Sequence, residues 1–122
     1  MQTRDQQRAS YAYSCVRAMV QDQFDEYATL VNGFGATVMR NGLVGALAFI
    51  ERRKDEAARR FLEQLKKYRL PGLGPSPGQR LPDWARQCQV DEYMLVTREI
   101  LQLVGWFRRA VQASQVQQET KE

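Results

Sequence analysis

Histidine is missing from this 122-residue chain, and cysteine occurs only twice. Without histidine, the chain lacks the commonest general base and the commonest metal ligand of proteins. The two cysteines, Cys15 and Cys88, lie far apart and neither forms a CxxC pair, so they suit reduced packing positions better than a disulfide or a nucleophile. The glycine-rich segments also lack the strand or the Lys-Ser/Thr pair that accompanies a phosphate-binding loop. These absences predict a protein that is not an enzyme and uses no metal, cofactor or small-molecule substrate.

Long uncharged runs are missing as well. None approaches the roughly 18 to 20 residues that a helix needs to cross a bilayer. The polar start, MQTRDQQR, lacks the apolar core of a signal peptide. We therefore expect a cytoplasmic protein with no membrane partner.

The period-two alternation of a half-buried strand is not found over any convincing length. Apolar residues recur instead at helical spacing, and a chain of 122 residues suits one domain with one core. The sequence therefore predicts an all-α fold, a single compact bundle of about five to six helices that spans residues 1–122. The expected helices cover about residues 3–21, 22–39, 43–52, 55–68, a short turn from Pro82, and 91–113. The polar residues 114–122 are expected to form a flexible tail.

A helix break is expected at Asn41 and Gly42, because both residue types tolerate a left-handed backbone. The ten residues from Asn41 to Ile50, NGLVGALAFI, carry no charge. A helix that is apolar on nearly every side has to be central in a bundle. Its larger side chains are therefore expected to fill the spaces between neighbouring helices: Leu43, Leu47, Phe49 and Ile50.

Proline is confined to one short segment of the chain. All four prolines lie between residues 71 and 82, together with three glycines. This composition predicts one long loop from Leu70 to Pro82, which we interpret as a tether. Trp84 follows the loop closely and is expected to anchor its far end rather than to bind a ligand.

The net charge of +4 is concentrated in one segment. Residues 52–69 contain eight Lys or Arg and three acidic residues, whereas the other 104 residues contain ten and eleven. A basic surface on an otherwise neutral body is typical of proteins that bind a phosphate backbone.

Six of these basic residues form pairs that are seven positions apart, close to two turns of an α-helix, so the pairs should lie along one helical face. The pairs are Arg52/Arg53, Arg59/Arg60 and Lys66/Lys67. Glu56 and Glu63 fall within the same stripe, so a solvated network of ion pairs is an equally good interpretation of the stripe alone.

Two motifs lie far apart in the chain. The first is Asn41-Gly42-Leu43, followed by the apolar residues 46–49. The second comprises Tyr93, Thr97, Arg98, Glu99, Leu101, Trp106, Arg109 and Ala110. With these motifs, the chain resembles the small helical subunit of the type III-B CRISPR-Cas effector, the Cmr complex, and the resemblance covers the chain from end to end in length and helix order.

The resemblance implies a non-catalytic subunit of a ribonucleoprotein that destroys foreign RNA in antiviral defence. In that family the small subunits stack into a short filament and line the channel where guide RNA and target RNA pair. The implied partners are the backbone subunit that holds the guide RNA, the large polymerase-like subunit, and further copies of the chain itself. Since base pairing supplies the sequence specificity, this subunit need only recognise backbone charge and shape.

The expected RNA-binding residues form two groups. The first group consists of the three basic pairs, Arg52, Arg53, Arg59, Arg60, Lys66 and Lys67. The second group consists of Arg8, Arg17, Arg40, Arg108 and Arg109. For the second group a surface or ion-pair role is the stronger interpretation, and Trp106 is expected to pack in the core or an interface.

A second class of function remains open at this point. The chain could be a helical protein–protein interaction module whose basic face docks an acidic partner and does not contact RNA. Exchanging the paired cations for Glu distinguishes these two functions. A subunit of an RNA-guided effector should lose RNA binding but still assemble with its partners, whereas an interaction module should fail to assemble.

Overall fold

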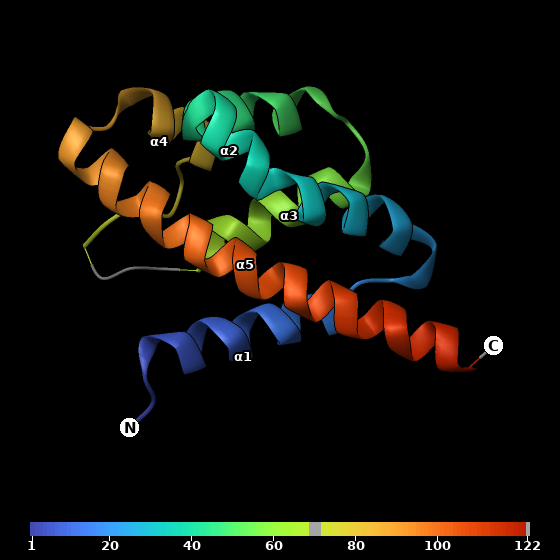
Figure 1. Cartoon of the computed structure of the whole chain (residues 1–122). Helices are drawn as coiled ribbons and strands as arrows, with labels where there is room; N and C mark the ends of the chain where they lie inside the picture. Colours follow the sequence, from blue (N-terminus) through green and yellow to red (C-terminus); the bar gives the residue numbers. More distant parts are fainter. Residues whose placement is uncertain (69–71, 122) are drawn as a thin grey trace.

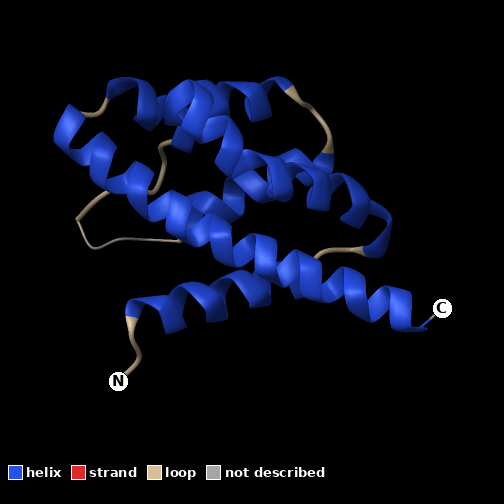
Figure 2. Cartoon of the chain, in the orientation of Figure 1, coloured by secondary structure: helices blue, strands red, loops and turns tan. Residues whose placement is uncertain are grey.

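The computed structural model describes residues 1–68 and 72–121, with side-chain environments up to residue 115. Within these residues the chain forms five α-helices and one short 3-10 helix, and no β-strand (Figure 2). The predicted all-α bundle of about five to six helices is confirmed. The elements are α1 (Arg4–Arg17), η1 (Gln21–Gln23), α2 (Phe24–Arg52), α3 (Glu56–Lys67), α4 (Leu81–Gln87) and α5 (Val90–Lys121).

The long helix α5 is the axis of the bundle. It runs across the molecule in Figure 1, with α1 packed against one side and α2 against another. Helix α3 packs on α2, and the short α4 lies beside α2. Every long element therefore contributes apolar side chains to one shared core.

Phe61 of α3 lies at the centre of this core and is fully buried. Its ring makes edge-on contacts with Tyr27 and Phe34 of α2, at centroid distances of 6.0 and 5.3 Å, and with Phe107 of α5 at 5.7 Å. Such pairs contribute about 0.5–1.5 kcal/mol each beyond area burial. One aromatic side chain thus joins three helices.

The predicted break at Gly42 is present as a sharp kink. Gly42 has φ 78° and ψ 168°, a non-helical conformation, so the two helices expected at 22–39 and 43–52 meet at this kink within the element α2. The kink interrupts the helical hydrogen bonds, and the backbone N–H of Val44 instead donates to the Tyr93 hydroxyl of α5 at 3.1 Å. The bend in α2 is therefore held by a side chain from another helix.

The segment 21–52 is long and apolar enough, by length and composition, to cross a membrane. Its second half buries Leu43, Ala46, Leu47 and Ile50, the spacing of a single helical face turned toward the core. The bundle therefore accounts for the apolar character of this face. Phe49 lies off the face and is 54% exposed, so the expectation that Phe49 fills space between helices is wrong.

The proline-rich segment is a loop in residues 72–80, as predicted; Leu70 and Pro71 lie outside the described residues. Trp84 of α4 is 5% exposed and its indole N–H donates to Glu92 at 3.2 Å. The same carboxylate accepts the backbone N–H of Gly74 at 2.9 Å. Trp84 therefore anchors the end of the loop, and Glu92 accepts hydrogen bonds from both the loop and α4.

Two helix ends differ from the prediction. Helix α1 ends at Arg17 rather than near residue 21, and α5 continues to Lys121 rather than ending near Ala113. The mobility expected for residues 114–122 stays a prediction, and Glu122 lies outside the described residues.

Candidate nucleic-acid interface

The three basic pairs belong to two helices. Helix α3 carries Arg59/Arg60 and Lys66/Lys67, whereas Arg52 is the last residue of α2 and Arg53 caps it. The prediction of one continuous helical stripe is therefore wrong, because the chain turns at residues 53–55 before α3 begins. Two pairs, rather than three, share the face of α3.

Ion pairing accounts for only part of the charge on α3. Glu56 lies 3.6 Å from Arg59 and 3.9 Å from Arg60, and all three side chains are well exposed. Exposed pairs of this kind contribute about 0–1 kcal/mol. Lys66 donates to the carbonyl of Pro77 at 3.2 Å, a contact that leaves its charge intact. The face of α3 is therefore still basic after its ion pairs are formed.

Arg8 has a different environment from the other candidates. Its side chain is 12% exposed and its guanidinium contacts the buried carboxylate of Glu99 at 2.6 Å, with a further contact to Asp5 at 2.8 Å. The hydrogen bond to Glu99 raises the pKa of Arg8 above its usual value. Because Glu99 lies on α5, this pair holds α1 against the axis of the bundle.

The remaining candidates of the second group are exposed. Arg17 lies at the end of α1 and donates to the carbonyl of Tyr13, and Arg40 precedes the kink in α2. Arg108 and Arg109 lie on α5, where the Arg109 guanidinium stacks 4.7 Å from the centre of the Trp106 ring. Trp106 itself is half-buried and packs against the core, as expected.

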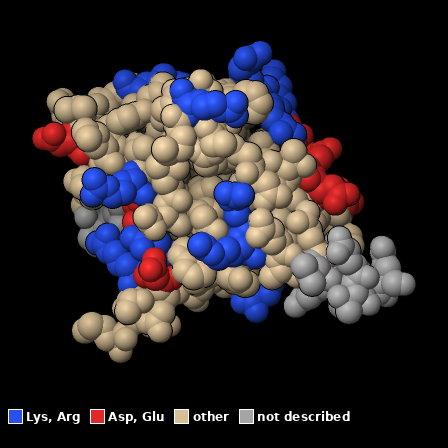
Figure 3. Space-filling model, in the orientation of Figure 1, with Lys and Arg blue, Asp and Glu red and all other residues tan. Residues whose placement is uncertain are grey.

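The candidate residues are not gathered into one patch. They come from four helices, and Figure 3 shows Lys and Arg side chains in several separate groups on the face it presents. The groups on α3 lie beside acidic side chains of the same helix. The surface can thus offer cations to more than one neighbour.

One basic residue beside α3 was missed by the sequence analysis. Arg80 occupies the N-cap position of α4 and contacts Glu51 of α2 at 2.6 Å. A groove separates α3 from the start of α4, and Arg80 lines it together with Arg59 and Lys66. Arg80 lies at the end of the predicted loop, outside any helical pattern, so the sequence carried no signal for its position.

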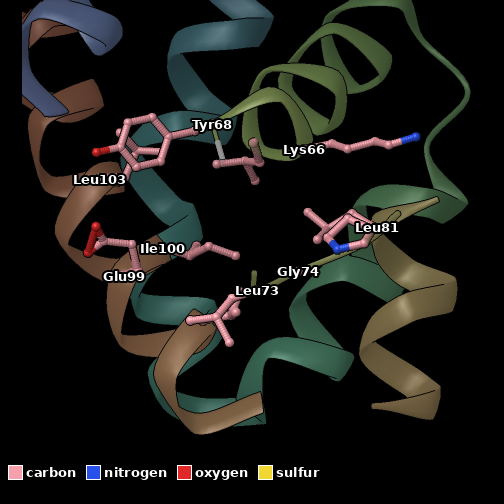
Figure 4. A pocket seen from close by; sticks show the side chains of 11 residues that line it. Lys66, Tyr68, Leu73, Gly74, Leu81, Glu99, Ile100 and Leu103 are labelled. Atoms are coloured by element: carbon pink, nitrogen blue, oxygen red, sulfur yellow. The ribbon is translucent and has the colours of Figure 1, made fainter. Parts of the chain in front are cut away.

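A second hollow, beneath the loop, is nearly filled. It is lined mainly by apolar side chains, and Figure 4 shows Leu73 and Ile100 at its wall with the charged ends of Lys66 and Glu99 directed away from it. Its volume of about 20 Å³ leaves room for roughly one water molecule. This cavity is too small for a ligand.

Nearly the whole of this chain is similar to proteins of one known family. The family model described as "CRISPR-associated protein (Cas_Cmr5)" matches residues 4–114. The chain is 32% identical over 114 residues to the CRISPR system Cmr subunit Cmr5 of Thermus thermophilus, covering 93% of this chain and 96% of that protein. The chain belongs to the Cmr5 family. The resemblance drawn from its two sequence motifs is confirmed.

The likeness to the Cmr5 family extends to the three-dimensional structure. A crystal structure of a CRISPR-associated Cmr5 family protein from Thermus thermophilus is similar, with a TM-score of 0.76 and 32% sequence identity. The similarity covers 92% of this chain and 97% of that chain.

Several of the residues that carry the Cmr5 resemblance have packing roles in this structure. Gly42 forms the kink, Tyr93 accepts the freed N–H of Val44, and Glu99 binds Arg8. Ala110 is buried in the core. The two motifs therefore contain residues that attach α1 and α2 to α5. They do not by themselves identify an RNA-binding surface.

Proposed function

We propose that the chain is the non-catalytic small subunit of a type III-B CRISPR effector, the Cmr complex, and that it acts in the cytoplasm in antiviral defence. Family membership across residues 4–114 carries this proposal. The curated relative bears the name of a Cmr subunit, and the match leaves little of the chain outside the shared domain.

Within this complex, copies of the chain stack into a short filament that lies beside the subunits holding the guide RNA. These copies line the channel in which guide and target RNA pair, and they link the large polymerase-like subunit at one end to the far end of the complex. A body with cations in several groups suits this position, because it can contact phosphates on one side and acidic protein surfaces on another. Guide–target base pairing supplies the sequence specificity, so backbone contacts suffice.

The RNA backbone contacts come first from the cations of α3 and the adjoining end of α2: the exposed Arg52, Arg59, Arg60 and Lys67, and the partly buried Lys66. Arg53 contributes less, because it is partly buried and lies 3.3 Å from Asp55. Arg17, Arg40, Arg108 and Arg109 form a second group. Arg8 ranks last, since an RNA phosphate would have to displace Glu99 from its guanidinium.

The test exchanges Arg59, Arg60, Lys66 and Lys67 for Glu in a reconstituted Cmr complex. Subunit composition and affinity for target RNA are measured over a range of salt concentrations. We expect a complete complex that binds RNA more weakly, with a salt dependence that is shallower by about 0.7 per lost phosphate contact on a single strand.

Arg98→Glu serves as the control for a reversed charge, because Arg98 is exposed on α5 and outside the proposed contacts. A complex that loses this subunit, while the remaining subunits bind RNA as before, would contradict the proposal. That result would show that the basic face docks a protein partner.

A further inference from the structure

The groove between α3 and the start of α4 has an apolar floor and a cationic rim. Leu62, Leu81 and Pro82 form the floor, where Leu81 and Pro82 are buried and Leu62 is half-buried. The rim holds Arg59 and Lys66 from α3 and Arg80 from the N-terminal end of α4, together with Glu63. The groove has a volume of about 240 Å³, an order of magnitude more than the cavity beneath the loop.

Two of the three rim cations, Lys66 and Arg80, are held by hydrogen bonds, and the third, Arg59, lies beside an acidic residue. Lys66 donates to the carbonyl of Pro77 at 3.2 Å, Arg80 contacts Glu51 at 2.6 Å, and Arg59 lies 3.6 Å from Glu56. An ammonium has three donors and a guanidinium has five, so each cation keeps N–H groups for a ligand. Positioning Lys66 and Arg80 in advance reduces the entropy that a ligand must overcome on binding.

A phosphate alone would use only the rim of this groove. A duplex backbone presents sugars and phosphates outward, with its bases stacked inside, and would leave the apolar floor empty. A nucleotide of an unpaired strand carries both parts, a flat base with an apolar face and a phosphate a few ångströms away. We propose that the groove binds one unstacked nucleotide of single-stranded RNA, with its base on Leu62, Leu81 and Pro82 and its phosphate at the rim. This inference rests on the proposed function of the α3 face.

Glu63 distinguishes this ligand from an acidic protein segment. A carboxylate on the rim repels the Asp or Glu side chains that three cations would otherwise attract. The same carboxylate can accept a hydrogen bond from the exocyclic amino group of a base, as Glu does from cytosine N4. The mixture of three cations and one acid therefore fits a base with an amino group better than an acidic peptide.

The test separates base contacts from backbone contacts by removing the bases. The affinity of the full chain at low salt is measured for a short oligocytidine and for an abasic strand with the same number of phosphates. We expect the wild-type chain to bind the abasic strand about fivefold or more weakly, since an unstacked base contributes measurably to single-strand binding. In Leu62→Ala this difference should shrink to about twofold or less. In Arg80→Gln, affinity for both strands should fall.

Two matched variants serve as controls. Leu101→Ala shortens a half-buried leucine of α5, and Arg98→Gln removes an exposed cation of the same helix; neither residue lines the groove. Both should bind the two strands as the wild type does. Thermal unfolding of every variant establishes that the bundle is folded, so that a change in affinity reports the groove.

The outcomes distinguish this inference from the function on which it rests. Equal affinity of the wild-type chain for both strands would overturn the nucleotide site while leaving backbone binding intact. A base effect that persists unchanged in Leu62→Ala would place the base elsewhere and also overturn it. No binding to either strand at low salt would contradict the RNA-binding function itself. Displacement of the oligocytidine by a short polyglutamate, combined with equal affinity for both strands, would assign the groove to an acidic protein segment.

Discussion

The kink at Gly42 leads to a sharp prediction about stability. With φ 78° and ψ 168°, Gly42 lies in a backbone region that is essentially restricted to glycine, and a side chain there costs about 1–3 kcal/mol. An added Cβ would stand 3.4 Å from the Tyr93 hydroxyl, at the lower limit of ordinary van der Waals contact, so the cost comes mainly from the backbone conformation. Gly42→Ala should therefore lower the free energy of unfolding by about 1–3 kcal/mol.

Gly33 provides the matched control. It lies in the same helix at a helical φ, and a Cβ there would meet nothing within 4 Å. Gly33→Ala should stabilise the chain by about 0.4–1 kcal/mol, because alanine restricts the unfolded chain more than glycine does. Urea unfolding followed by far-UV circular dichroism measures both variants. A Gly42→Ala protein as stable as the wild type would refute the account of the kink.

The hydrogen bond from the Val44 N–H at the kink to the Tyr93 hydroxyl can be tested in the same experiment. Tyr93→Phe keeps the ring and removes the hydroxyl that accepts the Val44 N–H, which leaves a half-buried donor unsatisfied at a cost of about 1–3 kcal/mol. If the hydroxyl acts through the kink, Gly42→Ala and Tyr93→Phe should be non-additive when combined. Strict additivity would show that the two residues contribute independently.

Two further predictions concern ionisable groups. Arg8→Met should destabilise the chain by about 3–5 kcal/mol in urea unfolding, because it leaves the buried Glu99 carboxylate with only a 3.8 Å contact to the exposed Arg4, whereas Arg4→Gln should change little. Burial raises the pKa of Tyr11 and of Tyr27 above the usual value near 10. The unfolded chain therefore releases these protons first, so stability should fall as pH rises above about 10. Ionisation of both tyrosines before unfolding, detected by absorbance near 295 nm, would contradict this assignment.

Local signals explain why much of the fold could be predicted from the sequence. The break at Gly42, the proline-rich loop and the anchoring role of Trp84 each depend on a residue type whose backbone or side-chain preference is strong. The same is true of the helical periodicity in α5. These features were placed correctly because few alternative arrangements satisfy them.

The features that were missed depend on residues far apart in the chain. Arg8 and Glu99 are 91 positions apart, and nothing in either neighbourhood indicates that they pair. Arg80 joins the groove only because the loop returns the chain to α3. Phe49 was placed in the core on its apolar character, yet the surrounding helices cover only the face defined by Leu43, Leu47 and Ile50. Tertiary packing determines the environment of the Arg8–Glu99 pair, of Arg80 and of Phe49, and the local sequence does not indicate it.

We propose that this Cmr5-family chain works within an RNA-guided effector. The most direct measurement is a pull-down of the tagged chain from its native cells, with nuclease-protected RNA and co-purifying proteins both identified. We expect recovery of a guide RNA together with the larger Cmr subunits. Recovery of the chain alone, or with an acidic protein and no RNA, would contradict it.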